Sequence, residues 1–471
     1  MSEVTRRLAA GAAGAVAAVV AFTVVSVGTG AGAEPARASA PGDLAARVPG
    51  AVVPSASPSA VLPGVGDAAP VPVGARLDAL LTPLLGQDAL GGSVSMDVVD
   101  VVTGDHLTRL GHDAPRTPAS TAKLLTASAA LSTLKPGTTL PTRVVRGSAA
   151  GDVVLVGGGD VLLAAGKGRD DLVDGHAGLA DLARLTAAAL KRDGTTRVTL
   201  HLDDTLFTGP AVSPQWRPTD VADGFVAPVQ ALAVDAGRTR SGKYAPRVAD
   251  PAMRAAQQFA DRLRAAGVDV RGGVARATAP AGSDVLGEVR SAPIGDVVEY
   301  ALTESDNTVA EVLARLVAAE TGAPATFAGA GPAIVTAVAG LGVPTAGAVL
   351  ADGSGLGDGS RVAPVTLTGI LAAASSDKHP ELRPLLSGLP VAGVSGTLAD
   401  RFDLRSQQPA AGVVRAKTGT LSGVSSLAGT VVDEDGRLLA FAVLADDVAG
   451  SEPARRALDT LATTLAECGC R

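Results

Sequence analysis

The sequence predicts an α+β protein built on a five-stranded antiparallel sheet flanked by helices, with a domain inserted into the chain. Two strand patterns near the start, at residues 93–101 and 106–110, are separated by a Thr-Gly-Asp turn and predict a hairpin. Three more lie near the end, at residues 413–421, 424–433 and 438–445, with an Asp-Gly turn between the last two. We expect these five strands to join in one sheet.

Helical patterns stand on either side of these strands. Residues 75–85 precede the hairpin, and residues 120–134 follow it. From residue 294 the 3.6-residue period of apolar positions returns and lasts until Gly322. Residues 452–466 form a closing helix. The helices therefore come from both ends of the chain.

Residues 140–285 have a different pattern of predicted elements, which indicates an insertion. Short β-like runs at 153–156 and 198–203 alternate there with helical runs at 179–191 and 253–266. A separate folded unit between two parts of one domain is the simplest interpretation of this change.

The chain has 471 residues, enough for two or three domains. Outside the insertion, residues 75–139 and 286–467 would form one discontinuous domain. Residues 34–74 carry eight prolines among alanine, glycine and serine, and this predicts an extended linker. Residues 468–471 are a C-terminal tail.

Residues 1–33 have the pattern of an export signal. Arg6 and Arg7 precede an apolar stretch, and the Ala-Gly-Ala sequence at 31–33 is a small-x-small cleavage site. An uncleaved stretch of this length would instead anchor the chain in a membrane. Under either interpretation the rest of the chain is extracytoplasmic, either secreted, in the cell wall, or anchored and facing outside.

Composition narrows the partners and the chemistry. The formal net charge of −7 does not favour a nucleic-acid partner, and no zinc-ligand spacing occurs. The only cysteines are Cys468 and Cys470, which could pair with each other or between molecules. We favour a mobile tail without a catalytic role. None of the five histidines stands near a motif such as Gly-x-Ser-x-Gly that would indicate a Ser-His-Asp triad, so the sequence does not support a triad and does not exclude one.

Three short motifs stand in order along the chain and together form the reacting set of an acyl-transferring serine enzyme. They are Ser-Thr-Ala-Lys at 120–123, Ser-Asp-Asn at 305–307 and Lys-Thr-Gly at 417–419. Asn307 is the only asparagine in the chain. Any one triplet arises by chance, but all three in this order and in fitting contexts should do so in well under about 1% of chains this long.

Ser120 and Lys123 are three residues apart at a predicted helix start, so their side chains share one face. A serine hydroxyl is a poor nucleophile until a base takes its proton. Lysine can be that base once desolvation and a neighbouring positive charge lower its pKa. Two further Ser-x-x-Lys pairs, at 132–135 and 375–378, lie at a helix end and in a polar loop, and we expect neither to react.

The second motif falls in a break between two helices. Ser305 could relay a proton to a leaving nitrogen, and Asn307 could hydrogen-bond a substrate amide. The alternative is that this motif only caps the helix that starts near residue 308, which needs no chemistry.

The third motif opens the late strands. Lys417 and the hydroxyls of Thr418 and Thr420 could bind a carboxylate, while Gly419 would let a substrate backbone lie along the strand edge. The backbone N–H groups of Ser120 and Thr420 could point at one oxyanion. A surface Lys-Thr-Gly turn is the alternative.

With these motifs the chain resembles the penicillin-binding and serine β-lactamase superfamily. More narrowly it resembles the low-molecular-mass class C group, the penicillin-binding protein 4 type D-alanyl-D-alanine carboxypeptidase/endopeptidases. The narrower resemblance rests on Pro-Ala-Ser-Thr-Ala-Lys at 118–123, Leu-Val-Gly-Gly-Gly-Asp at 155–160, Pro-Gln-Trp at 214–216, Asp-Gly-Ser-Gly-Leu at 352–356 and Ser-Gly-Thr-Leu at 395–398. Val161 departs from the pattern, where the family has proline.

The resemblance implies the transpeptidase fold of this superfamily, with a domain inserted between the first and second motifs. It implies hydrolysis of peptidoglycan stem peptides ending in D-Ala-D-Ala through an acyl-enzyme on Ser120, with no cofactor or metal, and covalent binding of β-lactam antibiotics. A serine β-lactamase and a non-catalytic peptidoglycan-binding protein are the alternatives. The three intact motifs argue against the second. No glutamate occurs at residues 321–380, where a class A β-lactamase would be expected to carry its deacylating base.

Overall fold

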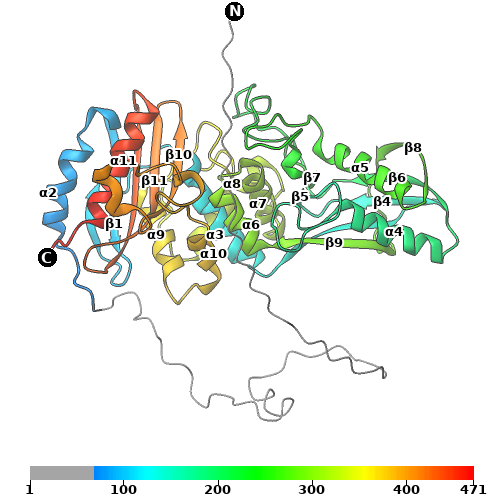
Figure 1. Cartoon of the computed structure of the whole chain (residues 1–471), viewed down its shortest axis with the longest axis horizontal. Helices are drawn as coiled ribbons and strands as arrows, with labels where there is room; N and C mark the ends of the chain where they lie inside the picture. The colour runs from blue at the N-terminus through cyan, green and yellow to red at the C-terminus, as the bar shows by residue number, and fades with distance from the viewer. Residues whose placement is uncertain (1–67) are drawn as a thin grey trace, which may run out of the picture. The chain divides into compact units, whose positions relative to one another are not determined.

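The computed structural model describes residues 68–471, which are organised around two separate five-stranded sheets (Figure 1). The predicted export signal and most of the predicted linker lie outside the described residues. Within residues 68–471, no helix is both long and apolar enough to cross a membrane.

The first sheet has the strand order β10-β11-β12-β1-β2, and all its neighbouring strands are antiparallel. This confirms the predicted sheet. Its strands are β1 (Ser93–Asp100), β2 (His106–Leu110), β10 (Arg415–Leu421), β11 (Val424–Val432) and β12 (Leu438–Asp446). Because β12 pairs with both β1 and β11, strands that lie more than 300 residues apart in the chain meet at the middle of the sheet.

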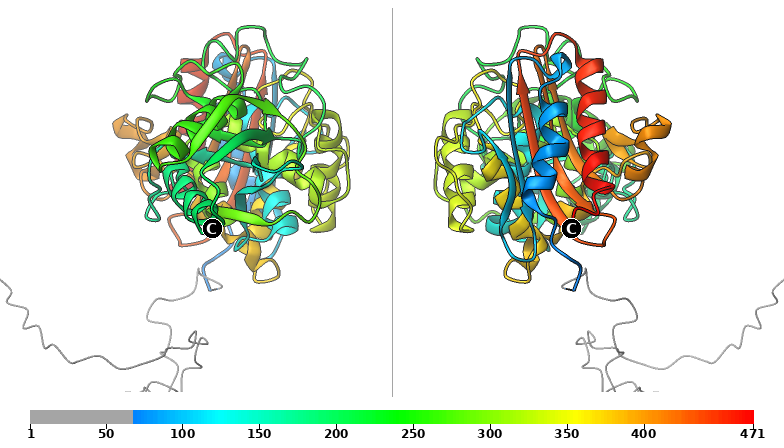
Figure 2. Two further views of the ribbon diagram at one scale, coloured as in Figure 1. Left: turned by 90° about the vertical axis from the view of Figure 1, so that its right-hand side faces the viewer. Right: turned by 90° about the vertical axis from the view of Figure 1, so that its left-hand side faces the viewer.

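Helices cover both faces of this sheet, which is why β12 is apolar almost throughout. Its alternate residues enter two different cores: Leu439 and Phe441 belong to one cluster, and Ala440 and Ala442 to the other. The first cluster lies beneath α2 (Gly74–Leu85) and α11 (Ser451–Ala466), which pack side by side (Figure 2). On the other face α9 (Pro364–Ser375) packs against β1 and β12.

Behind α9 lies a helical layer centred on α3 (Lys123–Leu134). Nine of its residues, from Lys123 to Leu131, are buried, because other helices surround it. Its neighbours are α6 (Ile294–Thr303), α7 (Asn307–Glu320), α8 (Phe327–Gly340) and the short α10 (Arg383–Ser387). Helix α3 therefore carries its first residue into the interior of the protein.

The second sheet has the order β8-β6-β4-β3-β9, with parallel pairs on the β8 side and antiparallel pairs on the β9 side. Helices α4 and α5 pack against it around a third core cluster. The elements are β3 (Thr139–Arg146), β4 (Asp152–Val156), α4 (Leu179–Arg192), β6 (Arg197–Asp203), α5 (Pro251–Ala265), β8 (Asp269–Arg276) and β9 (Val285–Pro293); a two-stranded sheet of β5 (Asp160–Leu163) and β7 (Leu232–Val234) adjoins them.

The sequence patterns had identified β4, β6, α4 and α5 but not β3, β8 or β9. The edge strand β8 is exposed along most of its length, so it has no alternation of apolar residues to detect. Strand β9 runs to Pro293, beyond the expected limit at residue 285. All described residues belong to one compact unit, so the division into a catalytic and an inserted domain stays a prediction.

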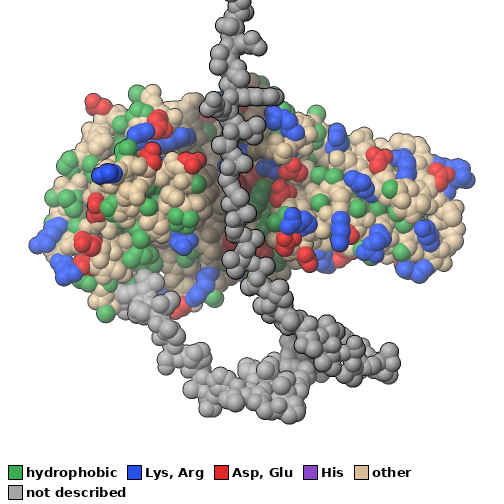
Figure 3. All heavy atoms as spheres, in the orientation of Figure 1, with side chains coloured by type: hydrophobic (Ala, Val, Ile, Leu, Met, Phe, Trp, Pro, Cys, Tyr) green, Lys and Arg blue, Asp and Glu red, His purple; other side chains and the backbone are tan. Residues whose placement is uncertain are grey.

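The arginines of the second sheet are paired with acidic residues. Arg197 contacts Asp269 at 2.6 Å, and Arg276 contacts both Asp204 and Asp250 at 2.8–2.9 Å. On the face that Figure 3 shows, basic and acidic side chains are interspersed.

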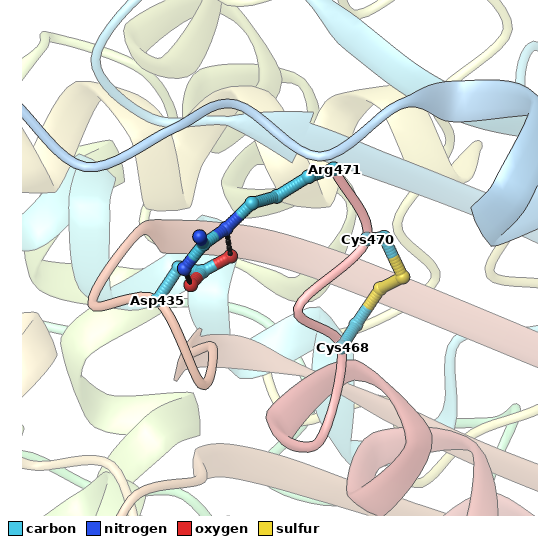
Figure 4. Close-up of a disulfide and its surroundings, with 4 residues drawn as sticks. All are labelled: Asp435, Cys468, Cys470 and Arg471. Atoms are coloured by element: carbon cyan, nitrogen blue, oxygen red, sulfur yellow. Dashed lines mark hydrogen bonds and ion pairs between the residues drawn. A yellow bond between two sulfur atoms is a disulfide. The ribbon is translucent and has the colours of Figure 1, made fainter.

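The C-terminal tail differs from the mobile segment that we expected. Cys468 and Cys470 are joined by a disulfide, and both are buried against the core beneath α11 (Figure 4). The Val73 N–H donates to the Cys470 carbonyl at 2.6 Å, and Arg471 pairs with Asp435. The tail is thus tied to the segment that leads into α2.

Candidate active site

The three sequence motifs converge on one cleft of about 1250 Å³, which is more than the usual ligand pocket offers. Ser120 lies in the 3₁₀ turn η3 (Ala119–Ala122) that leads into α3, and this turn packs against β10 and β11. Ser305 and Asn307 come from the junction of α6 and α7, and Thr418 and Thr420 from β10. Five predicted site residues line the cleft: Ser120, Ser305, Asn307, Thr418 and Thr420.

Lys123 lies directly behind the proposed nucleophile and is only 1% exposed. Its Nζ donates to Ser120 Oγ at 2.9 Å, to Asn307 Oδ1 at 2.6 Å and to the Ser354 carbonyl at 2.8 Å. Burial lowers the pKa of Lys123 to about 8, although the charges of nearby carboxylates, with Asp352 first, act to raise it. A substantial fraction of this amine is therefore neutral near pH 8 and able to accept a proton.

The Asp-Gly-Ser-Gly-Leu loop at residues 352–356 holds the Ser354 carbonyl in place. Asp352 accepts the N–H groups of Gly355 and Gly357, both at 2.7 Å, and the Trp216 indole N–H at 2.8 Å. Gly355 has a φ of +73°, and a Cβ there would lie 1.9 Å from the Ala119 carbonyl oxygen. The Asp-Gly-Ser-Gly-Leu motif thus packs directly against the turn that carries Ser120.

Glu311 supports the same loop from α7 and was not identified from the sequence. Its carboxylate accepts the N–H of Gly353 at 3.0 Å and that of Ser354 at 2.8 Å, and the side chain is buried. Burial and the nearby Asp352 raise the pKa of Glu311. A glutamate within a largely apolar helix gave no signal in the sequence, because its partners lie about 40 residues further along the chain.

The second motif takes the strained backbone of a helix junction. Ser305 has a φ of +53°, and its hydroxyl accepts from Lys417 Nζ at 2.9 Å. The helix cap is Asp306, whose carboxylate accepts the Val309 N–H at 3.0 Å. Only Asp306 caps the helix. A capping role for the whole motif therefore does not account for Ser305 and Asn307, which face the cleft.

Asn307 links the first two motifs. Its Oδ1 accepts from Lys123, and its Nδ2 donates to the Phe225 carbonyl at 3.0 Å. Helix α7 begins at Asn307 rather than near residue 308.

Lys417 is fully buried beside Ser305 and does not line the cleft. Besides Ser305, its Nζ contacts the Thr418 carbonyl at 2.9 Å. Burial, together with the charge of Lys123, lowers the pKa of Lys417 well below its usual range. The Thr418 hydroxyl faces the cleft and contacts Thr397 Oγ1 at 2.9 Å. Thr397 also lines the cleft. The sequence indicated no role for Thr397 beyond its place in the Ser-Gly-Thr-Leu motif at 395–398.

Gly419 also has a packing role that the sequence did not indicate. A Cβ at this position would lie 2.1 Å from Ser426 Oγ and 2.7 Å from the Pro118 carbonyl oxygen. The glycine therefore lets β10 approach the turn that carries Ser120. Strand β10 is nevertheless the edge of its sheet, as the expected pairing with a substrate backbone requires.

The other candidate residues lie elsewhere. Lys135 is bonded to the Ser132 carbonyl at the protein surface, and neither residue lines the cleft. None of the histidines lines the cleft either; His106 pairs with Asp97, which is bonded to Thr368. Within residues 68–471, no group of three or more His, Cys, Asp or Glu side chains could hold a metal ion.

This fold and this cleft define a serine acyl-transferring enzyme of the penicillin-binding type. The model of the D-Ala-D-Ala carboxypeptidase 3 (S13) family matches residues 77–246 and 240–467, so the chain belongs to this family.

Relatives of known name support the assignment. Carboxypeptidase Rv3627c of Mycobacterium tuberculosis is 39% identical over 86% of this chain and 87% of its own length. The D-alanyl-D-alanine carboxypeptidase of Actinomadura sp. strain R39 is 31% identical, with 86% and 87% covered. The crystal structure of penicillin binding protein 4 from Haemophilus influenzae superposes with a TM-score of 0.68 at 23% identity, covering 82% of this chain and 98% of that one, and shows the same fold.

Proposed function

We propose that this protein hydrolyses the D-Ala-D-Ala bond of peptidoglycan stem peptides, as carboxypeptidase or endopeptidase, through an acyl-enzyme on Ser120. One observation carries the proposal: a buried, partly neutral amine lies 2.9 Å from a serine hydroxyl that opens onto the cleft. Membership of the S13 family supports the substrate class.

We propose a role for each group in the acylation step. Neutral Lys123 takes the proton of Ser120 while Oγ bonds to the carbonyl carbon of the penultimate D-alanine. The C–N bond then breaks, and the proton that Lys123 has taken passes to the leaving amine by way of Ser305, which is bonded to Lys417, so Lys123 is neutral again. Asn307 lines the cleft and would hydrogen-bond the substrate amide. Water hydrolyses the ester in the second step and frees Ser120.

The terminal carboxylate of the substrate is proposed to bind at β10. Thr418 and Thr420 face the cleft and can donate hydroxyl hydrogen bonds to it. Lys417 lies behind them, and its hydrogen bonds to Ser305 and to the Thr418 carbonyl would hold these two residues in place rather than make an exposed contact. A β-lactam presents the same pairing of a carbonyl and a carboxylate, which is why covalent inhibition is part of the proposal.

A β-lactamase is the second candidate, and the structure offers it little support. Asp352 is occupied by the indole and backbone N–H groups described above, and Glu381 pairs with His379 away from the cleft. A non-catalytic role would not require a buried lysine beside a serine. We also propose that residues 1–33 direct export, so that the protein acts outside the cytoplasm or is held at the membrane through its N-terminus.

The nucleophile is tested with penicillin. Ser120→Ala should abolish both the covalent adduct, detected by mass spectrometry of the whole protein, and the release of D-alanine from a peptide ending in D-Ala-D-Ala. Ser132→Ala is the matched control and should retain both. An adduct that persists in the Ser120 variant, or that maps to Ser132 or Ser375, would contradict the assignment.

A further inference from the structure

Arg238 is a buried arginine that has no part in the acylation steps described above, yet it contacts the second motif. It follows the turn η4 (Asp235–Gly237), and its side chain is only 8% exposed. Its Nη2 lies 2.5 Å from Asp306 Oδ2, and its Nη1 lies 2.7 Å from Asp235 Oδ1. Burial lowers the pKa of Arg238, but these two carboxylates outweigh burial and raise it, so the guanidinium is charged.

Asp306 stands between the two cleft residues of its motif. Ser305 on one side contacts Lys417, and Asn307 on the other contacts Lys123. The Asp306 carboxylate is itself 3% exposed. A buried carboxylate that loses its cation keeps its full field in the interior, and a nearby lysine is the group that this field stabilises in its protonated form.

We propose that Arg238 is a positioning residue for the reaction: it fixes Asp306 between Ser305 and Asn307 and neutralises its charge, which otherwise would hold a proton on Lys123. The inference rests on the proposed role of Lys123 as the base. It assigns to the segment after β7, which lies in the predicted insertion, a direct part in tuning the catalytic serine.

Several other charged groups face these residues, and none of them is substituted in the variants below. Lys123 also faces Asp352, Glu311 and Lys243, and it shares the interior with Lys417. Around Arg238 lie Asp235, Tyr300, Asp174 and Arg247. Burial, with the charge of Asp235, raises the pKa of Asp174 to about 6, so the experiment is read above pH 7, where that carboxyl is ionised.

The experiment measures the rate of acylation by a fluorescent penicillin as a function of pH from 7 to 10. The rate should rise with pH as Lys123 loses its proton, with a midpoint near the pKa of Lys123. In Arg238→Gln this midpoint should move up by about one pH unit, the usual effect of one nearby charge, so the rate at pH 7 falls about tenfold and the plateau at high pH is largely kept.

A second substitution tests whether the effect passes through Asp306. Asn replaces Asp well as a helix cap, so Asp306→Asn removes the charge and keeps the cap. The double variant Arg238→Gln/Asp306→Asn should recover a midpoint at or below that of the wild type. Arg238→Lys, which keeps the charge, should leave the midpoint in place. Arg276→Gln, which removes an arginine with two carboxylate partners outside the cleft, is the matched control and should not move it.

If folded Arg238→Gln keeps the wild-type midpoint of the acylation rate against pH, the proposal is overturned. This holds even if the rate falls equally at all pH values, because a loss that does not depend on pH indicates only a structural role. A double variant that stays shifted would also overturn it. If Arg238→Gln does not fold, Asp306→Asn alone decides: its midpoint should fall below that of the wild type, and an unchanged midpoint refutes the proposal. If Lys123→Ala keeps the same midpoint, the base assignment itself has failed, which is a different result.

Discussion

Removing the amine of Lys123 should stop most acylation without unfolding the protein. The Nζ of Lys123 makes three hydrogen bonds, at 2.9, 2.6 and 2.8 Å, and one of its acceptors is Ser120, the proposed nucleophile. Loss of a positioned base slows a reaction by on the order of 10²–10⁴. This corresponds to about 3–5 kcal/mol of transition-state stabilisation.

The pKa of Lys123 also predicts how the acylation rate changes with pH. Lys123 acts as a base only when it is neutral, and with a pKa of about 8 roughly one tenth of it is neutral at pH 7. The wild-type acylation rate should therefore increase as pH rises from 7 to 9. Lys123→Ala should lose this rise along with the rate.

Stopped-flow fluorescence with a labelled penicillin measures the acylation rate, and thermal unfolding checks that each variant is folded. The control is Lys135→Ala, which removes a lysine of the same Ser-x-x-Lys spacing that is bonded only to the Ser132 carbonyl at the surface. It should acylate normally. Near-normal acylation by folded Lys123→Ala, with the pH rise retained, would show that another group takes the proton.

The remaining predictions concern the substrate, the acyl-enzyme and the strand edge. A peptide whose terminal D-alanine is amidated should turn over slowly in a D-alanine release assay, since it loses charge-assisted contacts at Thr418 and Thr420; equal turnover of acid and amide would remove this role. The penicilloyl adduct should persist for far longer than the peptidyl one when both are followed by mass spectrometry, and rapid recovery from penicillin without D-alanine release would favour a β-lactamase. Gly419→Ala should lower stability by about 1–3 kcal/mol in chemical denaturation, because its Cβ meets Ser426, and should slow acylation. Gly137→Ala, which meets nothing within 4 Å, is its control and should change neither.

Local patterns were enough to predict the catalytic sheet and the order of the motifs. Strands β11 and β12 of that sheet have clear apolar runs with a turn between them. The Ser-x-x-Lys pair lies at a helix start, where three-residue spacing alone brings two side chains together. The second sheet was only half predicted, because β8 is exposed and β3 and β9 pair across about 140 residues of chain.

The C-terminal tail with its two cysteines is another part of the structure that local sequence patterns did not predict. Two cysteines at the end of a chain gave no reason to expect burial, and only the packing of α11 against the sheet places Cys468 and Cys470 in a core. Likewise the expected role of Gly419 followed from its position on a strand edge, whereas the contacts that exclude a side chain there come from Ser426 on the neighbouring strand and from Pro118, about 300 residues away.

The sequence by itself determined which residues are proposed to carry the chemistry: a serine and a lysine on one helical turn, and two further motifs in the order of an acyl-transferring enzyme. Only the tertiary structure decided how those residues are tuned. The pKa of Lys123 depends on burial and on carboxylates from other helices and loops, and Arg238 meets Asp306 across 68 positions of the chain. Desolvation and electrostatic fields depend on distance in space, and a linear pattern does not contain that distance.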